Sequence, residues 1–171
     1  MRWPDLSQAL GRLPWAVAGA AATRLYMPER STQDLDVVVL AGDGTEVRRR
    51  LEAGGYASKG ELAIGGSAWT APDGTPVDVI EGRETWWPQA LAEATGNRDA
   101  QGLPVLTLPY LVLMKLLAGR VQDVADVTRM LGHADEEGVA GVRSVIGGHA
   151  TDLSEDLESL ITLGKLEVEG G

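Results

Sequence analysis

Cysteine is absent from this 171-residue chain, and histidine occurs only twice. The chain therefore forms no disulfide, offers no thiolate ligand and does not complete a zinc site with histidine alone. Long apolar runs are also missing, because the longest, over residues 15–22, is far shorter than the ~20 residues that cross a bilayer. Any bound metal ion must use oxygen ligands. With no apolar leader segment at the start, we expect a cytoplasmic protein.

Basic residues are outnumbered, with 15 lysines and arginines against 25 acidic residues and a formal net charge of -10. A surface for extended nucleic acid usually shows as a basic face, so long RNA or DNA is disfavoured as a partner. The only basic run, Arg48–Arg50, is expected on a helix, where consecutive side chains point ~100° apart and form no single patch. A small or cationic acceptor, or a compact protein, suits this charge better.

The pattern of predicted elements changes near residue 108. Upstream, strands are predicted over residues 15–18, 35–40, 61–70 and 76–80, and helices over 20–26, 46–53 and 84–94. Downstream, only helices are predicted, over residues 110–118, 121–131, 136–146 and 153–163, with 164–171 as a frayed end. These patterns indicate a core over residues 1–108 that contains strands and helices, followed by a helical bundle over residues 109–171.

Two aspartates, Asp34 and Asp36, are separated by one residue at the start of a predicted strand. On a strand this spacing directs both carboxylates to the same face, where two like charges crowd together unless a cation lies between them. Oxygen ligands of this kind suit Mg²⁺ together with substrate phosphates. An isolated Asp-x-Asp is more often simply solvated. Here, however, the turn at Gly19-Ala20 opens a helix whose first N–H groups favour an anion, and phosphoryl transfer needs both parts.

A third acid, Asp78, lies in an otherwise apolar strand, where an unpaired carboxylate is costly. We expect it to share metal with Asp34 and Asp36, so that one ion activates an acceptor hydroxyl and another neutralises a leaving pyrophosphate. Arg30 and Thr32 precede the acidic pair and are candidates for contact with phosphate or acceptor. A loop arginine that simply stays in water is an equally good interpretation.

These residues resemble a known signature. Gly19-Ala20, a helix and loop, and then Arg30-Ser-Thr-Gln-Asp34-Leu-Asp36-Val-Val look like the glycine turn, helix and R-x-T-x-D-h-D-h-h motif of minimal nucleotidyltransferases of the DNA polymerase β superfamily. This family includes toxin-type enzymes of abortive-infection systems and antibiotic nucleotidyltransferases. The resemblance implies an α+β fold: a small mixed β-sheet core with flanking helices and a C-terminal helical bundle. It also implies Mg²⁺ or Mn²⁺ as cofactor and Asp78 as the third acid.

The segment from Lys115 to Asp126 resembles the helical part of the toxin-type members, where a lysine precedes an R-x-x-D pattern. The resemblance implies that Lys115 contacts nucleotide phosphates and that Asp123 orients either Lys115 or Arg120. The i,i+3 spacings of Arg120 with Asp123 and of Asp126 with Arg129 are equally typical of ordinary surface ion pairs.

One departure from the family pattern lies in the glycine turn, because relatives usually carry Gly-Ser or Gly-Gly where this chain has Gly19-Ala20. No side-chain hydroxyl is therefore available for the terminal phosphates, and backbone N–H groups must hold them. The missing hydrogen bond is worth about 0.5–1.5 kcal/mol. This departure affects the expected catalytic strength more than the fold.

The resemblance implies an enzyme that transfers a nucleoside monophosphate from a nucleoside triphosphate to an acceptor hydroxyl and releases pyrophosphate. The acceptor is left open between a small antibiotic-like molecule, an RNA 3′ end and a protein side chain. In a toxin–antitoxin pair, an antitoxin protein would be a further partner. The alternative hypothesis is a catalytically weak or inactive nucleotide-binding or partner-binding module on the same fold.

Overall fold

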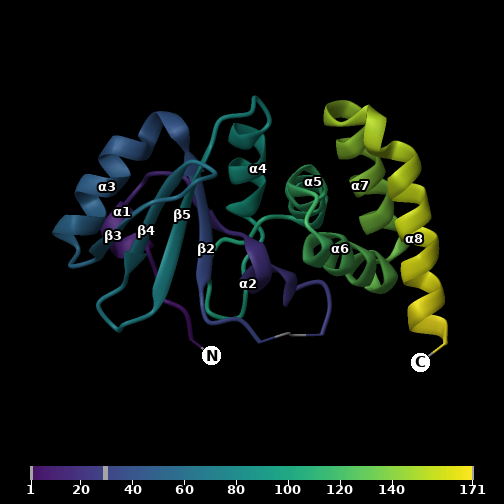
Figure 1. The fold of residues 1–171 in the computed structure, drawn as a ribbon, viewed down its shortest axis with the longest axis horizontal. Helices are drawn as coiled ribbons and strands as arrows, with labels where there is room; N and C mark the ends of the chain where they lie inside the picture. Colours follow the sequence, from purple (N-terminus) through teal and green to yellow (C-terminus); the bar gives the residue numbers. More distant parts are fainter. Residues whose placement is uncertain (1, 29–30, 171) are drawn as a thin grey trace. The chain divides into compact units, whose positions relative to one another are not determined.

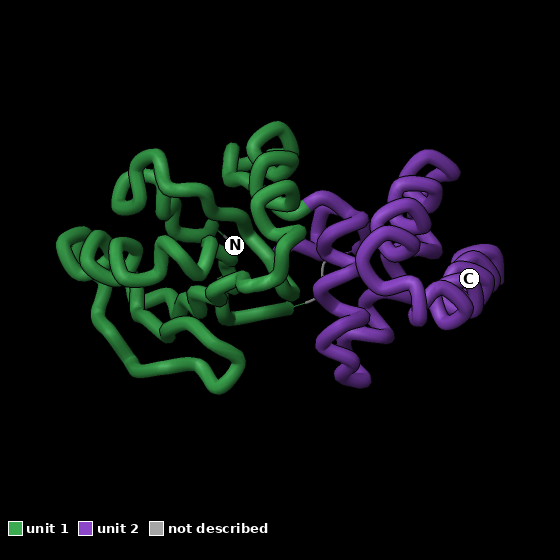
Figure 2. Tube along the Cα trace, turned by 90° about the horizontal axis from the view of Figure 1, so that it is seen from above, with its two compact units in different colours: residues 1–21, 30–106 green, residues 22–29, 107–171 purple. Residues whose placement is uncertain are grey.

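The computed structural model describes residues 2–28 and 31–170. The predicted site residue Arg30 lies outside these described residues. The chain forms two compact units, one of residues 1–21 and 30–106 and the other of residues 22–29 and 107–171 (Figure 2). Within the described residues, no helix has both the length and the apolar character that a membrane span requires.

The first unit is built on a five-stranded mixed sheet in the order β1-β2-β5-β4-β3. The strands are β1 (Trp15–Val17), β2 (Leu35–Leu40), β3 (Ala57–Glu61), β4 (Gly66–Thr70) and β5 (Pro76–Gly82). Strands β2 and β5 run parallel, whereas every other neighbouring pair is antiparallel. The α+β fold with a mixed sheet is therefore confirmed.

Helices cover both faces of this sheet. Helices α1 (Ser7–Leu10) and α3 (Gly44–Ala53) lie on one side, and α4 (Trp87–Ala94) lies on the other (Figure 1). A short 3-10 helix, Ala41–Asp43, leads into α3, and α2 (Gly19–Thr23) follows β1. Along β2 the aliphatic side chains of Leu35 and residues 37–39 are all completely buried, which is the pattern of a central strand covered on both faces.

The predicted strand over residues 61–70 is confirmed in part: residues 66–70 form β4, which makes an antiparallel hairpin with β5 around the turn at residues 71–75. Residues 62–65 are not strand but the turn between β3 and β4. Gly65 and Gly66 have φ values of +93° and +118°, which allow the chain to turn between the two strands. All five residues of β3 are exposed. The strand therefore lacks the alternation of apolar and polar residues on which the sequence prediction depends.

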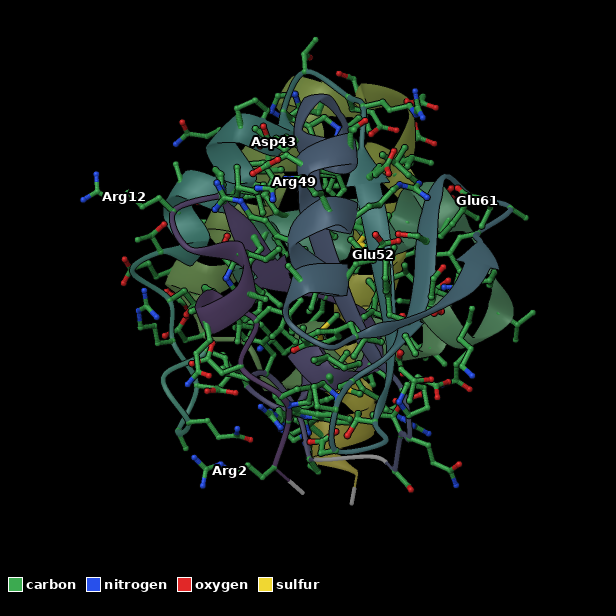
Figure 3. All side chains as sticks on the ribbon, turned by 90° about the vertical axis from the view of Figure 1, so that its left-hand side faces the viewer. Arg2, Arg12, Asp43, Arg49, Glu52 and Glu61 are labelled. Atoms are coloured by element: carbon green, nitrogen blue, oxygen red, sulfur yellow. The ribbon has the colours of Figure 1, made fainter. Side chains whose placement is uncertain are left out.

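The prediction that Arg48, Arg49 and Arg50 form no single basic patch agrees with their contacts. Arg48 donates hydrogen bonds to Glu61 on β3, whereas Arg49 and Arg50 both donate to Glu46 on their own helix. Arg49 and Glu61 are labelled in Figure 3. The hydrogen bonds from Arg49 and Arg50 lower the pKa of Glu46 to about 2. Each guanidinium is thus directed to an acidic side chain of the same unit.

The second unit is a helical bundle. Its helices are α5 (Leu108–Ala118), α6 (Val121–His133), α7 (Glu136–His149) and α8 (Ser154–Glu169), with a 3-10 turn, Thr151–Leu153, before α8. The predicted frayed end is wrong, because α8 continues through Glu169. Gly164 lies against α6: a Cβ at this position would be only 2.2 Å from the carbonyl oxygen of Thr128. Packing against α6 thus stabilises a helical segment whose glycine and charged residues would not favour a helix in isolation.

Gly164→Ala is expected to lower the free energy of unfolding by about 1–3 kcal/mol, because the added methyl group forces α6 and α8 apart. The higher helix propensity of alanine, worth about 1 kcal/mol, offsets only part of this loss. Gly147→Ala on α7 is the matched control, since its added Cβ meets nothing within 4 Å. Urea unfolding of both variants tests the prediction, and equal midpoints would contradict it.

Candidate active site

Two carboxylates lie side by side on the central strands of the first unit. Asp36 on β2 is the register partner of Asp78 on the parallel strand β5. Register partners on neighbouring strands direct their side chains to the same face of the sheet. Both residues are half-buried. The two strands that carry these acids are therefore neighbours in the sheet, as a shared metal site requires.

Asp34 is exposed and lies in a bend just before β2 begins at Leu35. Its position near Asp78 shows in the electrostatics: burial raises the pKa of the Asp78 carboxyl, and the negative charge of Asp34 raises it further. Two like charges therefore interact at this end of the strand pair. Such an arrangement favours a bound cation, because a cation relieves the repulsion.

Gly19 brings the turn after β1 into contact with Asp36. Its φ is +56°, and a Cβ at this position would lie 1.9 Å from the Oδ2 atom of Asp36. The backbone N–H of Ala18 also donates to the Asp36 carbonyl oxygen at 2.8 Å. Only glycine meets both requirements, a left-handed conformation and room for the neighbouring carboxylate. The glycine turn and the first acidic strand thus form one local structure.

Ala20 follows Gly19 in α2, which ends at Thr23 instead of continuing to residue 26 as predicted. The N–H groups of Tyr26 and Met27 bond to the Thr23 carbonyl in turns. A helix of five residues has fewer aligned peptide dipoles than the predicted one. The contribution of this helix to anion binding is correspondingly smaller than the sequence pattern suggests.

The chemistry of the three aspartates fits a divalent cation, but they do not form a ready-made cluster. Over residues 2–28 and 31–170, no group of three histidine, cysteine, aspartate or glutamate side chains is arranged to hold a metal ion. The carboxylate of Asp36 lies against Gly19, whereas Asp78 interacts with Asp34. The available donors are carboxylate oxygens, which Mg²⁺ and Mn²⁺ prefer.

Lys115 lies in a buried ion cluster of the second unit. Its Nζ donates to Oδ1 of Asp123 at 3.0 Å and to Oδ2 of Asp126 at 2.8 Å. Asp126 is therefore a buried residue that binds Lys115, and not a solvated surface residue. Burial tends to raise the pKa of Asp123, but hydrogen bonds from Arg120 and Lys115 outweigh it and hold the pKa below its usual value.

Two further regions of the first unit contain a predicted site residue, Thr32, and a buried aromatic pair. Thr32, which is half-buried, donates through Oγ1 to the Asp34 carbonyl oxygen at 3.3 Å, so it braces the loop that leads into β2. Trp86 and Trp87, two adjacent aromatic residues at the start of α4, are both buried with ring centroids 4.0 Å apart. They pack in the interior and offer no open stacking surface.

The chain is similar to two solved structures of the antibiotic-resistance factor ANT(2'')-Ia. A solution structure of that protein matches with a TM-score of 0.53 over 96% of this chain and 94% of the other, at 16% identity. A crystal structure in complex with adenylyl-2''-tobramycin matches with a TM-score of 0.51 over 95% and 94%, also at 16% identity. No protein-family model and no curated protein matches the chain. The similarity shows that the chain shares the fold of ANT(2'')-Ia, in agreement with the α+β fold that the resemblance implied.

Proposed function

We propose that this chain, which has the fold of a nucleotidyltransferase, transfers a nucleoside monophosphate from a nucleoside triphosphate to an acceptor hydroxyl. The observation that carries the proposal is the pairing of Asp36 with Asp78 on adjacent parallel strands, next to the Gly19 turn. In this reaction the acceptor oxygen bonds to the α-phosphorus and the bond to the pyrophosphate group breaks. The hydroxyl proton is released, and pyrophosphate leaves.

Asp34, Asp36 and Asp78 are the residues that would hold Mg²⁺ or Mn²⁺. When bound, such ions supply activation of the acceptor hydroxyl and neutralisation of the charge that develops on pyrophosphate. Asp78 would orient the acceptor, because it is the acid furthest along the sheet from the glycine turn. The proposed nucleotide-binding residues of the first unit are Gly19, Ala20, Arg30 and Thr32. Lys115 and Asp123, for which the resemblance implied the same role, bind each other in the buried ion cluster of the second unit.

A small cationic molecule with free hydroxyl groups is the acceptor that we favour. The formal net charge of -10 repels a long polyanion and attracts a cation. The protein in one matching structure carries adenylyl-2''-tobramycin, a nucleotidylated small molecule. Modification of an antibiotic-like compound therefore fits this chain better than action on RNA or on a toxin target.

The test is to incubate the purified protein with α-labelled nucleoside triphosphates, Mg²⁺ or Mn²⁺, and three acceptor classes. These are tobramycin-like aminoglycosides, a short RNA with a free 3′ end, and a protein extract. We expect label on the small molecule. Nucleotide binding without transfer to any acceptor would favour the alternative of a non-catalytic binding module, and absence of both binding and transfer would overturn the proposal.

An RNA acceptor would give a different salt dependence. If only terminal nucleotides make contact, log affinity should fall with log salt concentration with a slope corresponding to about one to three phosphates. Titration of acceptor binding against salt measures this slope. A slope corresponding to about six or more phosphates would contradict the inference from net charge, even if nucleotidyl transfer itself were found.

Gly19→Ala is expected to reduce transfer by about 100-fold, because the new methyl group displaces the Asp36 carboxylate by an ångström or more. The left-handed backbone adds a loss of about 1–2 kcal/mol in the free energy of unfolding. Gly42→Ala is the control, since an added Cβ there meets nothing within 4 Å and no positive φ is involved. If Gly19→Ala transferred label at the wild-type rate, the Gly19 turn would have no role in the reaction.

A further inference from the structure

A cavity of about 290 Å³ lies in the first unit, where three segments of the chain meet. They are the N-terminal segment with Trp3 and Asp5, the turn between β4 and β5 with Asp73, and the loop that contains Gln101. The volume corresponds to about ten water molecules at ~30 Å³ each, and it is near the lower end of the range for ligand sites. The cavity therefore suits a small molecule.

The wall of this cavity includes a buried polar group without a partner. Trp3 is only 3% exposed. Within residues 2–28 and 31–170, its indole Nε1 is the one buried side-chain nitrogen or oxygen that has no hydrogen-bond partner. Buried polar groups are nearly always paired, because an unpaired donor keeps the whole cost of losing water. The N–H of Trp3 therefore needs an acceptor that the described part of the chain does not supply.

The backbone that carries this indole is held in place. The backbone N–H of Trp3 donates to Oε1 of Gln101 at 3.0 Å, and Nε2 of Gln101 donates to the Trp3 carbonyl oxygen at 3.1 Å. Asp99 shapes the loop of Gln101, because its Oδ1 accepts from the N–H groups of Gln101 and Leu103 at 2.8 and 2.9 Å. A ligand that binds beside Trp3 would therefore lose little affinity to the ordering of this wall.

Two carboxylates line the same cavity, and each has a fixed orientation. Oδ1 of Asp5 accepts from the N–H of Ser7, and Oδ1 of Asp73 accepts from the N–H of Thr75, both at 2.9 Å. The hydrogen bonds from Thr75 lower the pKa of Asp73, so its carboxylate is ionised at neutral pH. Each carboxylate keeps further lone pairs with which it can accept from a ligand.

The charge of this region favours a cation. Burial raises the pKa of the Tyr56 hydroxyl, and the negative charges of Asp73 and Asp5 raise it further. Both carboxylates thus act on one buried phenol, and a cation beside them would relieve the unfavourable interaction. The lining also contains the guanidinium of Arg2, so two negative charges and one positive charge give it a net charge of -1. A ligand with a single positive charge balances this lining.

We propose that this cavity binds a small ammonium compound that carries a hydroxyl group. The ammonium group donates to Asp5 and Asp73, and the hydroxyl oxygen accepts from the Nε1–H of Trp3. A neutral polyol leaves both carboxylates without a cation, and an amino acid adds a carboxylate to a lining that is already negative. The site goes beyond the proposed transfer reaction and does not depend on it, because its lining residues are different from the three aspartates of the candidate active site.

Titration of the ¹⁵N-labelled full chain with ethanolamine at neutral pH, followed through the indole N–H resonances, tests the proposal. The Trp3 resonance is identified by its absence from the spectrum of Trp3→Phe. If that variant does not fold, cross-relaxation between the indole proton and the protons of Gln101 gives the same identification. Ethanolamine should move the Trp3 resonance downfield, because its hydroxyl oxygen completes the hydrogen bond.

Three matched probes separate the contributions of the ligand. Ethylene glycol lacks the ammonium group and should bind about tenfold more weakly or less, because the charge-assisted contacts are lost. Ethylammonium lacks the hydroxyl group and should bind without the downfield shift of Trp3. Glycine replaces the hydroxyl group by a carboxylate and should also bind more weakly than ethanolamine, because the lining is negative.

Asp5→Asn and Asp73→Asn should each weaken ethanolamine binding by about fivefold or more, because a charge-assisted contact is lost. Asp43→Asn is the matched control, since it makes the same substitution just before α3 begins at Gly44, whereas Tyr56 follows the other end of that helix. Asp43 lies near the top of Figure 3, and the cavity residue Arg2 lies near the bottom. The affinity of this control should stay close to that of the wild type.

Asp36→Asn separates the cavity from the acidic strands, and it should leave the Trp3 shift unchanged. Four results would overturn the proposal: a Trp3 resonance that ethanolamine does not move, equally strong binding of ethylene glycol, tighter binding of glycine, or wild-type affinity in both Asp5→Asn and Asp73→Asn. Loss of the shift in Asp36→Asn would overturn it as well, because the ligand would then bind at the acidic strands. A protein that transferred no label would lose the enzymatic proposal, whereas these titrations would still decide the role of the cavity.

Discussion

Asp36→Asn should reduce nucleotidyl transfer by about a thousandfold or more, since several kcal/mol of charge stabilisation depend on the metal-binding carboxylates. The free energy of unfolding should stay unchanged or rise slightly. The reason is that the asparagine removes one of the negative charges that crowd the Asp34 and Asp78 region. Transfer of label and urea unfolding, measured on the same preparation, should therefore change independently.

Glu52→Gln is the control for this variant. Glu52 is exposed on α3 of the same unit, so the substitution makes the same change in charge away from the acidic strands (Figure 3). It should leave both transfer and stability near the wild-type values. If Asp36→Asn transferred label at the wild-type rate, Asp36 would have no role in the reaction.

The largest effect on stability is expected from Lys115→Met, with a loss of about 3–5 kcal/mol in the free energy of unfolding. Methionine leaves the buried Asp123 and Asp126 without their shared cation. Domains of this kind are stable by only about 5–15 kcal/mol, so the variant should lie close to unfolding at room temperature. Chemical denaturation at neutral pH measures the loss, with the exposed Arg129→Met on α6 as control.

The difference in the free energy of unfolding between Lys115→Met and the wild type should become smaller at acidic pH. Because the pKa of Asp123 is lowered in the folded wild type, its contribution to stability is complete above the unfolded pKa and is lost as the pH falls through the folded pKa. In the variant, protonation removes the charge of a buried carboxylate that has lost Lys115 as its partner. A fall in pH therefore lowers the free energy of unfolding of the variant less than that of the wild type. A difference that stayed constant from neutral pH to below the ordinary aspartate pKa would contradict the buried-charge explanation.

The sequence was sufficient to predict that Asp36 and Asp78 belong to one site. Each is an acidic residue in a strand of mostly apolar residues, where a carboxylate needs a partner or a metal ion. The motif from Gly19 to Asp36 likewise predicted a glycine turn next to an acidic strand. The contact of Gly19 with the Asp36 side chain was not predictable, since it depends on the antiparallel pairing of β1 with β2. The absence of a preformed three-ligand cluster among the described residues depends on side-chain orientations that no spacing specifies.

The buried ion cluster around Lys115 was likewise predicted only in part from the sequence. Residue types near Lys115 indicated that its charge needed an anion, but i,i+3 spacing suggested Arg129 as the partner of Asp126. In the structure Asp126 accepts from Lys115, eleven residues earlier on another helix, and from Gln122 on its own helix. Contacts between helices depend on how α5 and α6 pack, and periodicity within one helix does not describe that packing.

By itself, the sequence determined the order of most strands and helices, the acidic residues of the candidate site and the exclusion of thiolate chemistry. These properties follow from local periodicity and from side-chain chemistry, which need no knowledge of distant contacts. Only the tertiary structure decided that α8 extends through Glu169, that Lys115 is buried between two carboxylates, and that Arg120 is the exposed cation of that cluster. Each of these depends on close packing between segments far apart in the chain, where burial changes both the room available to a side chain and the cost of its charge.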